Sequence, residues 1–263
     1  MTLPTLRYSR SIAMLAFVTV VASPARADLT PEELAKLSQN PIGNIINVPF
    51  QENANLNDGT DKRTTNVVNI QPVISIEISK DWNLLTRSIL PIISQPESDG
   101  GRTNGVGDMQ FDLWLTPASR ARWTWGFGPF VQAPTHSNGQ LGNDHWGLGP
   151  TVVLVHVDKD SPWVYGVTAY NVWSVGSGSE SSSYNNGLIH PFINYNLPGG
   201  TGTYLTSAPQ ITVNWKADSG QQWTVPIGGG IGHIFHFGKL PVNMSVQGYY
   251  NVVRPDNSAN WLI

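Results

Sequence analysis

The stretch "LPVNMSVQGYYNVV", residues 240–253, decides the fold, because apolar and polar residues alternate along most of its length. Val242 and Met244 fall on one face of an extended chain, while Asn243 and Gln247 fall on the other. A period of two residues is that of a β-strand, whose successive side chains point to opposite faces. The stretch therefore predicts a strand with one apolar face and one polar face.

The same alternation recurs along the chain and predicts eleven strands, followed by a short stub at 260–263. The predicted strands cover approximately 42–50, 65–79, 82–93, 107–116, 122–133, 146–157, 162–174, 187–197, 203–215, 222–236 and 240–252. Most are longer than the five or six residues that are usual in globular proteins. They fit tilted membrane-spanning strands of about 9–11 residues with additional residues at each rim.

The connections between these strands alternate in length. Short ones such as "KD" and "DKDS" follow long ones such as "SQPESDGGRTNGV" and "APTHSNGQLGNDH". Outer-membrane barrels have long extracellular loops and short periplasmic turns. Seven tryptophans near predicted strand ends are typical of the aromatic girdles at membrane interfaces. We therefore predict an all-β fold, an antiparallel up-and-down transmembrane β-barrel of about 12 strands: eleven plus a truncated last strand.

The N-terminal residues 1–27 have the pattern of a signal peptide. Arg7 and Arg10 precede the apolar run "SIAMLAFVTVVA", and Ala25-Arg26-Ala27 has small residues at the positions that signal peptidase reads. The predicted mature chain begins at Asp28. We expect export to the outer membrane of a Gram-negative bacterium, with the barrel-assembly machinery and outer-membrane lipid as partners.

Residues 28–41 form a predicted periplasmic segment ahead of the barrel, which covers 42–263. Thr30 and Glu33 have the spacing of a capping box, and Pro31 stands at the first helical position. These residues predict a short helix, about two turns long, which ends before Pro41. It could lie in the periplasmic mouth of the barrel or inside it as a plug.

Composition and spacing exclude several classes of function. The chain has no cysteine, and loss of residues 1–27 would change its net charge from −3 to −6. An acidic chain without a basic patch predicts no nucleic acid partner. Asp108 and Asp112 lie about 13 Å apart along one strand, whereas paired catalytic carboxylates need about 5 to 9.5 Å. We predict no catalytic residues, no metal, no cofactor and therefore no enzyme.

The polar faces of the predicted strands supply candidates for lining the lumen. They are Glu77, Arg87, Asp108, Gln110, Asp112, Arg122, Gln132, His190, Asn194, Asn243 and Gln247. A three-residue turn in the "KD" hairpin would place Glu77 and Arg87 on the same face, with Trp82 outside. This side of the barrel is either a path whose charges orient a small solute or an internal salt-bridge network that fills the lumen.

Several segments resemble a known family. They include "NVVNIQPVISIEISKDWNLLTRSILPIISQP", "GVGDMQFDLWLTPA", "WTWGFGPFVQAPT", "WVYGVTAYNVWSV" and "WTVPIGGGIGHIFHFGKLPVNMSVQGYYNVVRPDNSANW". From about Leu34 to Trp261 the chain resembles the MetA-pathway phenol-degradation, transporter-like outer-membrane family of proteobacteria. The resemblance implies an outer-membrane β-barrel with a role in the uptake of small, often aromatic compounds. It supplies no site residues.

We therefore predict a channel or transporter through which small organic solutes diffuse along a polar lumen. One alternative is a structural, non-conducting outer-membrane barrel with a filled lumen. The other is a secreted β-sandwich that binds a ligand, because an apolar face can meet a core as well as lipid.

Overall fold

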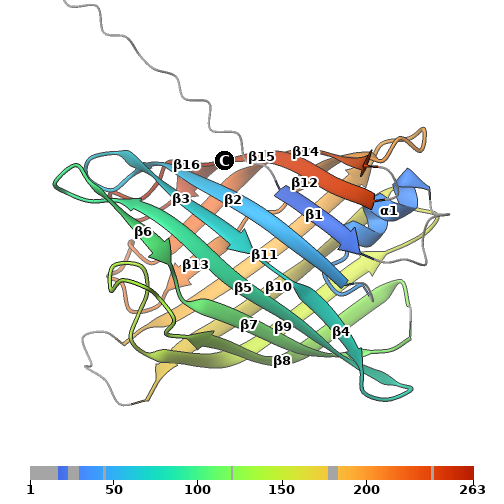
Figure 1. The fold of residues 1–263 in the computed structure, drawn as a ribbon, viewed down its shortest axis with the longest axis horizontal. Helices are drawn as coiled ribbons and strands as arrows, with labels where there is room; N and C mark the ends of the chain where they lie inside the picture. Colours follow the sequence, from blue (N-terminus) through green and yellow to red (C-terminus); the bar gives the residue numbers. More distant parts are fainter. Residues whose placement is uncertain (1–16, 23–29, 44–45, 120, 177–182, 238–239) are drawn as a thin grey trace, which may run out of the picture.

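The computed structural model describes residues 17–22, 30–43, 46–119, 121–176, 183–237 and 240–263. It contains one helix, α1 (Pro31–Ser38), and strands that close into a barrel (Figure 1). The strands are β1 (Phe17–Ala22), β2 (Ile46–Asp58), β3 (Arg63–Ile70), β4 (Val73–Glu77), β5 (Trp82–Pro96), β6 (Arg102–Val106), β7 (Met109–Pro117), β8 (Trp123–Ala133), β9 (Trp146–Val157), β10 (Trp163–Val175), β11 (Asn185–Asn196), β12 (Thr203–Ser207), β13 (Ile211–Asn214), β14 (Trp223–Phe237), β15 (Leu240–Val253) and β16 (Trp261–Leu262).

The strands occupy twelve positions around the barrel wall, and three of these positions hold an interrupted strand. β3 continues as β4, β6 continues as β7, and β12 continues as β13. Pro72 and Pro209 lie in two of the interruptions, where the missing proline N–H removes a ladder hydrogen bond. All neighbouring strands pair antiparallel, so the predicted up-and-down barrel of about 12 strands is confirmed. A single sheet closed on itself excludes the β-sandwich.

The twelfth position is shared by two short strands. β16 pairs with Tyr249 and Tyr250 of β15 and with β2. Farther along the same seam, β1 pairs with β15 on one side and with β2 on the other. The strand that we expected to be truncated therefore shares its place with residues 17–22. Of the predicted signal peptide, 1–16 and 23–27 lie outside the described residues, and its cleavage remains a prediction.

The first strand differs from the prediction. We expected it at 42–50 with a long polar loop up to residue 64, but β2 runs from Ile46 to Asp58 and only 59–62 connect it to β3. The polar residues of "QENANLND" resemble a loop in composition, yet they alternate along a strand. A polar strand is stable here because one face lines a barrel interior rather than an apolar core.

The two ends of the barrel differ. The end with the connections 78–81, 118–122, 158–162 and 197–202 is called the turn end. The opposite end carries 134–145, 176–184, 215–222 and 254–260 and is called the loop end. The predicted three-residue turn in the "KD" hairpin is confirmed, since the Ile78 N–H donates to the Trp82 carbonyl oxygen. Glu77 therefore shares a face with Arg87.

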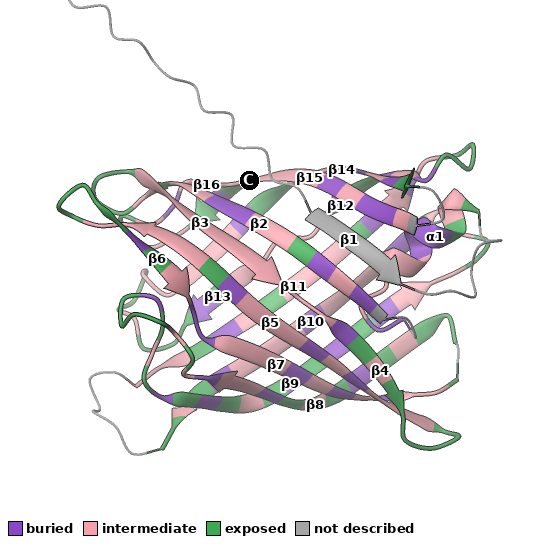
Figure 2. Ribbon diagram, in the orientation of Figure 1, coloured by how far each residue is buried: buried purple, intermediate pink, exposed green. Residues whose placement is uncertain are grey.

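The outer surface is apolar, as a lipid-facing surface must be. Figure 2 shows exposed segments recurring along the wall, and large apolar side chains such as Phe127, Ile227 and Ile231 are 51%, 63% and 52% exposed. Exposed tryptophans stand near both ends, including Trp123 and Trp163 at the turn end. At the loop end, Trp146, Trp173, Trp215 and Trp261 are exposed as well. No helix among the described residues is long and apolar enough to cross a membrane.

Candidate channel lumen

The barrel interior is filled on one side and hollow on the other. Buried apolar side chains from β4, β5, β7 and β9 pack together on the filled side, with Trp114 and Val155 fully buried. On the hollow side lie an inner cavity of about 180 Å³ next to α1 and an outer cavity of about 520 Å³ toward the loop end. The two cavities share lining residues, among them Gln51, Arg87 and His190, so they adjoin at that level.

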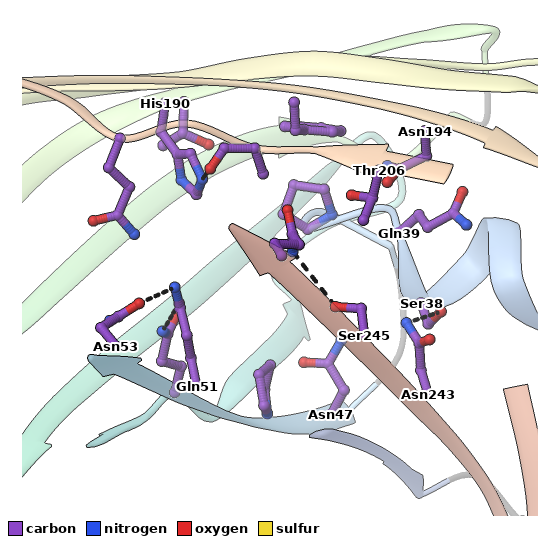
Figure 3. Close-up of a pocket in the computed structure, with 18 of the residues that line it drawn as sticks. Ser38, Gln39, Asn47, Gln51, Asn53, His190, Asn194, Thr206, Asn243 and Ser245 are labelled. Carbon is purple, nitrogen blue, oxygen red and sulfur yellow. Dashed lines mark hydrogen bonds between the residues drawn. The ribbon is translucent and has the colours of Figure 1, made fainter. Parts of the chain in front are cut away.

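Side-chain amides from β2 lie on the cavity side of the wall (Figure 3). Because strand side chains alternate, Asn47, Gln51 and Asn53 share one face of β2. Gln71 Nε2 donates to Gln51 Oε1 at 2.9 Å, and Gln51 Nε2 donates to Asn53 Oδ1 at 3.0 Å. Gln71 and Asn53, the two ends of this hydrogen-bonded chain, both line the cavities.

A buried ion pair stands between the filled and hollow sides. Arg87 donates to Asp112 Oδ2 from Nε at 2.9 Å and from Nη2 at 2.7 Å. The Thr151 hydroxyl donates to Asp112 Oδ1 at 2.8 Å and accepts from Trp114 Nε1 at 3.1 Å. Asp112 is fully buried, and its two oxygens accept three hydrogen bonds that compensate its charge. The guanidinium carbon of Arg87 also lies 5.0 Å from the centre of the Trp114 ring.

Asp108 holds the 134–145 connection against the loop end of the cavity. Its oxygens accept the N–H of His136 at 3.2 Å, the N–H of Asn143 at 2.7 Å and His136 Nδ1 at 2.7 Å. Gln132 Nε2 donates to it at 3.3 Å. Burial, and next the charge of Asp108, raise the pKa of Tyr184 at this end to about 12, so its phenol stays protonated.

Helix α1 lies at the turn end and borders the inner cavity (Figures 1 and 3). The predicted capping box is present: the Glu33 N–H donates to Thr30 Oγ1 at 3.2 Å, and Glu33 Oε2 accepts the Thr30 N–H at 2.9 Å. Three polar contacts hold the helix to the wall. Gln39 Nε2 donates to Asn196 Oδ1 at 3.0 Å, Ser38 Oγ accepts from Asn243 Nδ2 at 2.9 Å, and Lys36 Nζ donates to the carbonyl oxygen of Lys159 at 2.9 Å.

The apolar side of α1 contacts the wall as well. Leu34 and Ala35 form a buried cluster with Tyr204 and Ile234. A side chain at Gly232 would collide with the Tyr204 ring, so the glycine makes room for the residue that supports the helix. The Tyr204 hydroxyl then donates to Asn243 Oδ1 at 2.7 Å. Because α1 also contacts the turn residues Lys159 and Gly202, it lies in the mouth of the barrel at the turn end, one of the two positions left open by the sequence.

Comparisons with known proteins support this architecture. No family model and no curated protein matches the chain. Among solved structures, the crystal structure of the COG4313 outer membrane channel from Pseudomonas putida F1 matches with a TM-score of 0.50 and 15% identity, over 89% of this chain and 94% of that one. This chain has the fold of an outer membrane channel. At that identity the likeness shows the fold alone, and the finer resemblance to the MetA-pathway family stays a prediction.

Within this channel fold, most of the sequence-predicted residues lie next to the hollow. Those that line one or both cavities are Arg87, Asp108, Gln110, Gln132, His190, Asn194, Asn243 and Gln247. Asp112 lies behind Arg87 as its partner. Glu77 is exposed at the turn end, and Arg122 pairs with Asp158 at 3.2 Å with 71% of its side chain exposed. The structure therefore does not bring Glu77 and Arg122 to the cavities.

Other residues of the channel fold line the cavities but were missed. They are mainly Asn47, Gln51, Asn53, Gln71, Tyr204 and Gln210. Gln51 and Asn53 belong to the polar half of β2, which we had assigned to a loop, whereas Asn47 lies in the part that we had predicted as a strand. The alternation of Asn47, Gln51, Asn53 and Asn55 at even spacing was the signal that could have found them.

Proposed function

We propose that this chain is an outer-membrane channel through which small organic solutes diffuse passively. One observation carries the proposal: the adjoining inner and outer cavities are lined by polar side chains inside a barrel whose outer surface is apolar. A polar interior and an apolar exterior are the reverse of a soluble protein and are typical of outer-membrane channels. The likeness to the outer membrane channel of Pseudomonas putida F1 supports the same function.

The proposal extends to location and partners. The chain is exported by its N-terminal signal peptide and folded into the outer membrane by the barrel-assembly machinery. Its apolar belt then contacts lipid, the turn end and α1 face the periplasm, and the loop end faces outward. Small solutes, including aromatic ones as the family resemblance implies, enter at the loop end. In this account the lumen binds no cofactor or metal and performs no chemistry.

A second candidate, a non-conducting barrel, is favoured by one observation. Buried apolar side chains fill one side of the interior, and three polar contacts hold α1 at the turn end. In that case the Arg87–Asp112 pair is structural and the cavities are closed spaces.

Liposome swelling separates the two functions. The purified chain is folded into liposomes, and swelling is followed with solutes of increasing size, from phenol to sugars. The channel predicts swelling faster than that of protein-free liposomes, with an upper size limit. Swelling equal to that of protein-free liposomes for every solute would contradict the channel and favour the non-conducting barrel.

A further inference from the structure

The charges next to the cavities are compensated. Among the described residues, the only arginine, lysine, aspartate or glutamate side chains that line either cavity are Arg87 and Asp108. Arg87 is paired with Asp112 through two hydrogen bonds, and Asp108 accepts four hydrogen bonds from three residues at the loop end. A passing ion therefore meets no uncompensated side-chain charge that could replace its water of hydration.

Amides dominate the lining instead. Nine residues around the inner cavity and ten around the outer cavity are asparagine or glutamine. Each amide offers two N–H donors and an oxygen acceptor, all without net charge. A hydroxyl group, which donates one hydrogen bond and accepts two, can be matched by such a lining on every side. The lining therefore suits a neutral solute with several hydroxyl groups better than it suits an ion.

One amide oxygen is left without a partner next to the inner cavity. Asn47 is only 4% exposed, it lines the inner cavity, and its Oδ1 has no hydrogen bond among the described residues (Figure 3). An unpaired buried acceptor destabilises a fold. The oxygen itself is covered in this structure, so a solute hydroxyl would reach it, and satisfy it, when the Asn47 side chain turns toward the cavity. The volume of about 180 Å³ is below the usual range for drug-sized ligands, so the occupant is small.

From the compensated charges, the amide lining and this unpaired oxygen, we propose that the lumen selects neutral polyhydroxylated solutes over ions, with Asn47 as an acceptor in the inner cavity. The proposal rests on the proposed channel function and adds its substrate class. The ligand is a polyol or small sugar.

Tracer exchange across liposomes containing the full chain tests the selectivity. Sorbitol, gluconate and N-methylglucamine share a six-carbon hydroxylated chain and differ in charge. Equal concentrations on both sides prevent a membrane potential. We expect sorbitol to exchange faster than either ion by about tenfold or more.

The outcomes separate the two proposals. Equal exchange of all three solutes would overturn the selectivity and leave the channel intact. No exchange above that of protein-free liposomes would overturn the channel function and the selectivity with it. Faster exchange of either ion than of sorbitol would also overturn the selectivity.

Two matched variants test whether the missing charge is the cause. Gln51→Glu places a carboxylate beside both cavities, whereas Gln222→Glu makes the same change in the connection at the loop end. We expect Gln51→Glu to raise the exchange of N-methylglucamine relative to gluconate by about fivefold, since a fixed negative charge attracts the cation. The ratio should stay unchanged in Gln222→Glu, and an unchanged ratio in both variants would contradict the proposal.

Asn47→Leu tests the acceptor directly. Because Asn47 Oδ1 is unpaired in the structure, its replacement by an apolar side chain of similar size should not destabilise the barrel. We expect heat-resistant folding on gels to be kept while sorbitol exchange at low concentration falls about fivefold, through loss of one hydrogen bond. Full folding with unchanged sorbitol exchange would contradict the role of Asn47.

Discussion

At the scale of the residue, Arg87 and Asp112 show how the interior tolerates charge. Arg87 is buried, yet two hydrogen bonds to Asp112 and the face of Trp114 compensate it. Removing one member of such a pair leaves the other buried without a partner. We therefore expect Asp112→Asn to destabilise the folded barrel by about 3 to 5 kcal/mol, measured as unfolding by urea in detergent micelles.

The paired variant Arg87→Met with Asp112→Leu provides the control. It removes both charges and leaves no buried ion, so its stability should lie within about 2 kcal/mol of the original chain. A double variant as unstable as Asp112→Asn alone would show that the stabilising effect comes from packing around Trp114 rather than from charge compensation.

The contribution of Glu33 to the cap of α1 should depend on pH. Hydrogen bonds from the Thr30 N–H, and then from its hydroxyl, hold the pKa of Glu33 below the ordinary value of 4.5. A carboxylate with a lowered pKa stabilises the fold above its ordinary pKa, and this contribution is lost as the pH falls through the lowered value. The cap of α1 should therefore weaken as the pH falls below the ordinary value of 4.5.

Conductance in planar bilayers reports that loss. We expect conductance to rise as the pH falls below the ordinary glutamate value of 4.5, because Glu33, with its lowered pKa, takes up its proton there. Glu33→Gln should remove most of this change, while Glu32→Gln, outside the capping box, should leave it. The same rise in both variants would assign the pH dependence to another group.

At the scale of the element, α1 is the part that borders the inner cavity at the turn end. Ala35 is fully buried against the wall in a cluster with Tyr204 and Ile234. Ala35→Glu would place a charge in this apolar contact and cost several kcal/mol unless the helix leaves it. We expect higher conductance in planar bilayers with the barrel itself still folded, since α1 is not part of the wall.

A disulfide between α1 and the wall should have the opposite effect to Ala35→Glu, because it prevents the helix from leaving. The chain has no cysteine, so Ser38→Cys with Asn243→Cys introduces a single pair at a position where the two side chains are hydrogen-bonded. Oxidation should hold α1 in place and keep conductance low, and reduction should restore the original level. Conductance that does not respond to Ala35→Glu or to oxidation would show that α1 does not obstruct the path.

The elements were also predicted unevenly from the sequence. The alternation in 240–252 and the capping box at Thr30 and Glu33 are local patterns, and β15 and α1 agree with them closely. The polar half of β2 was assigned to a loop, because a lumen-facing strand can be as polar as a loop. The docking of α1 was left open, since Gln39 bonds Asn196 and Ser38 bonds Asn243, contacts that no local pattern encodes.

The closure of the barrel between β15 and β2 could not be predicted from local patterns either. The shared twelfth position, with β16 and β1 between β15 and β2, depends on pairing between the two ends of the chain. Sequence periodicity predicts which residues are strands but not which distant strands pair across the closure.

At the scale of the whole molecule, the two faces of the wall meet different surroundings. Ile231 on β14 is 52% exposed on the outer face, whereas Gln247 on β15 lines the inner cavity. Arginine on a lipid-facing strand near mid-membrane costs about 2 to 4 kcal/mol, whereas lumen-facing positions tolerate polar changes. We expect Ile231→Arg to impair folding into lipid vesicles and Gln247→Arg to fold normally, as measured by heat-dependent mobility on gels. Equal folding of the two variants would contradict the assignment of the faces.

The central claim is that solutes pass through the two cavities, and cysteine labelling during planar-bilayer recording tests it most directly. Gln51→Cys lies where the inner and outer cavities adjoin, and Ile227→Cys, 63% exposed on the outer face, is the control. A charged, membrane-impermeant thiol reagent should lower the current of Gln51→Cys irreversibly and leave that of Ile227→Cys unchanged. A current through Gln51→Cys that the reagent does not alter would contradict the account.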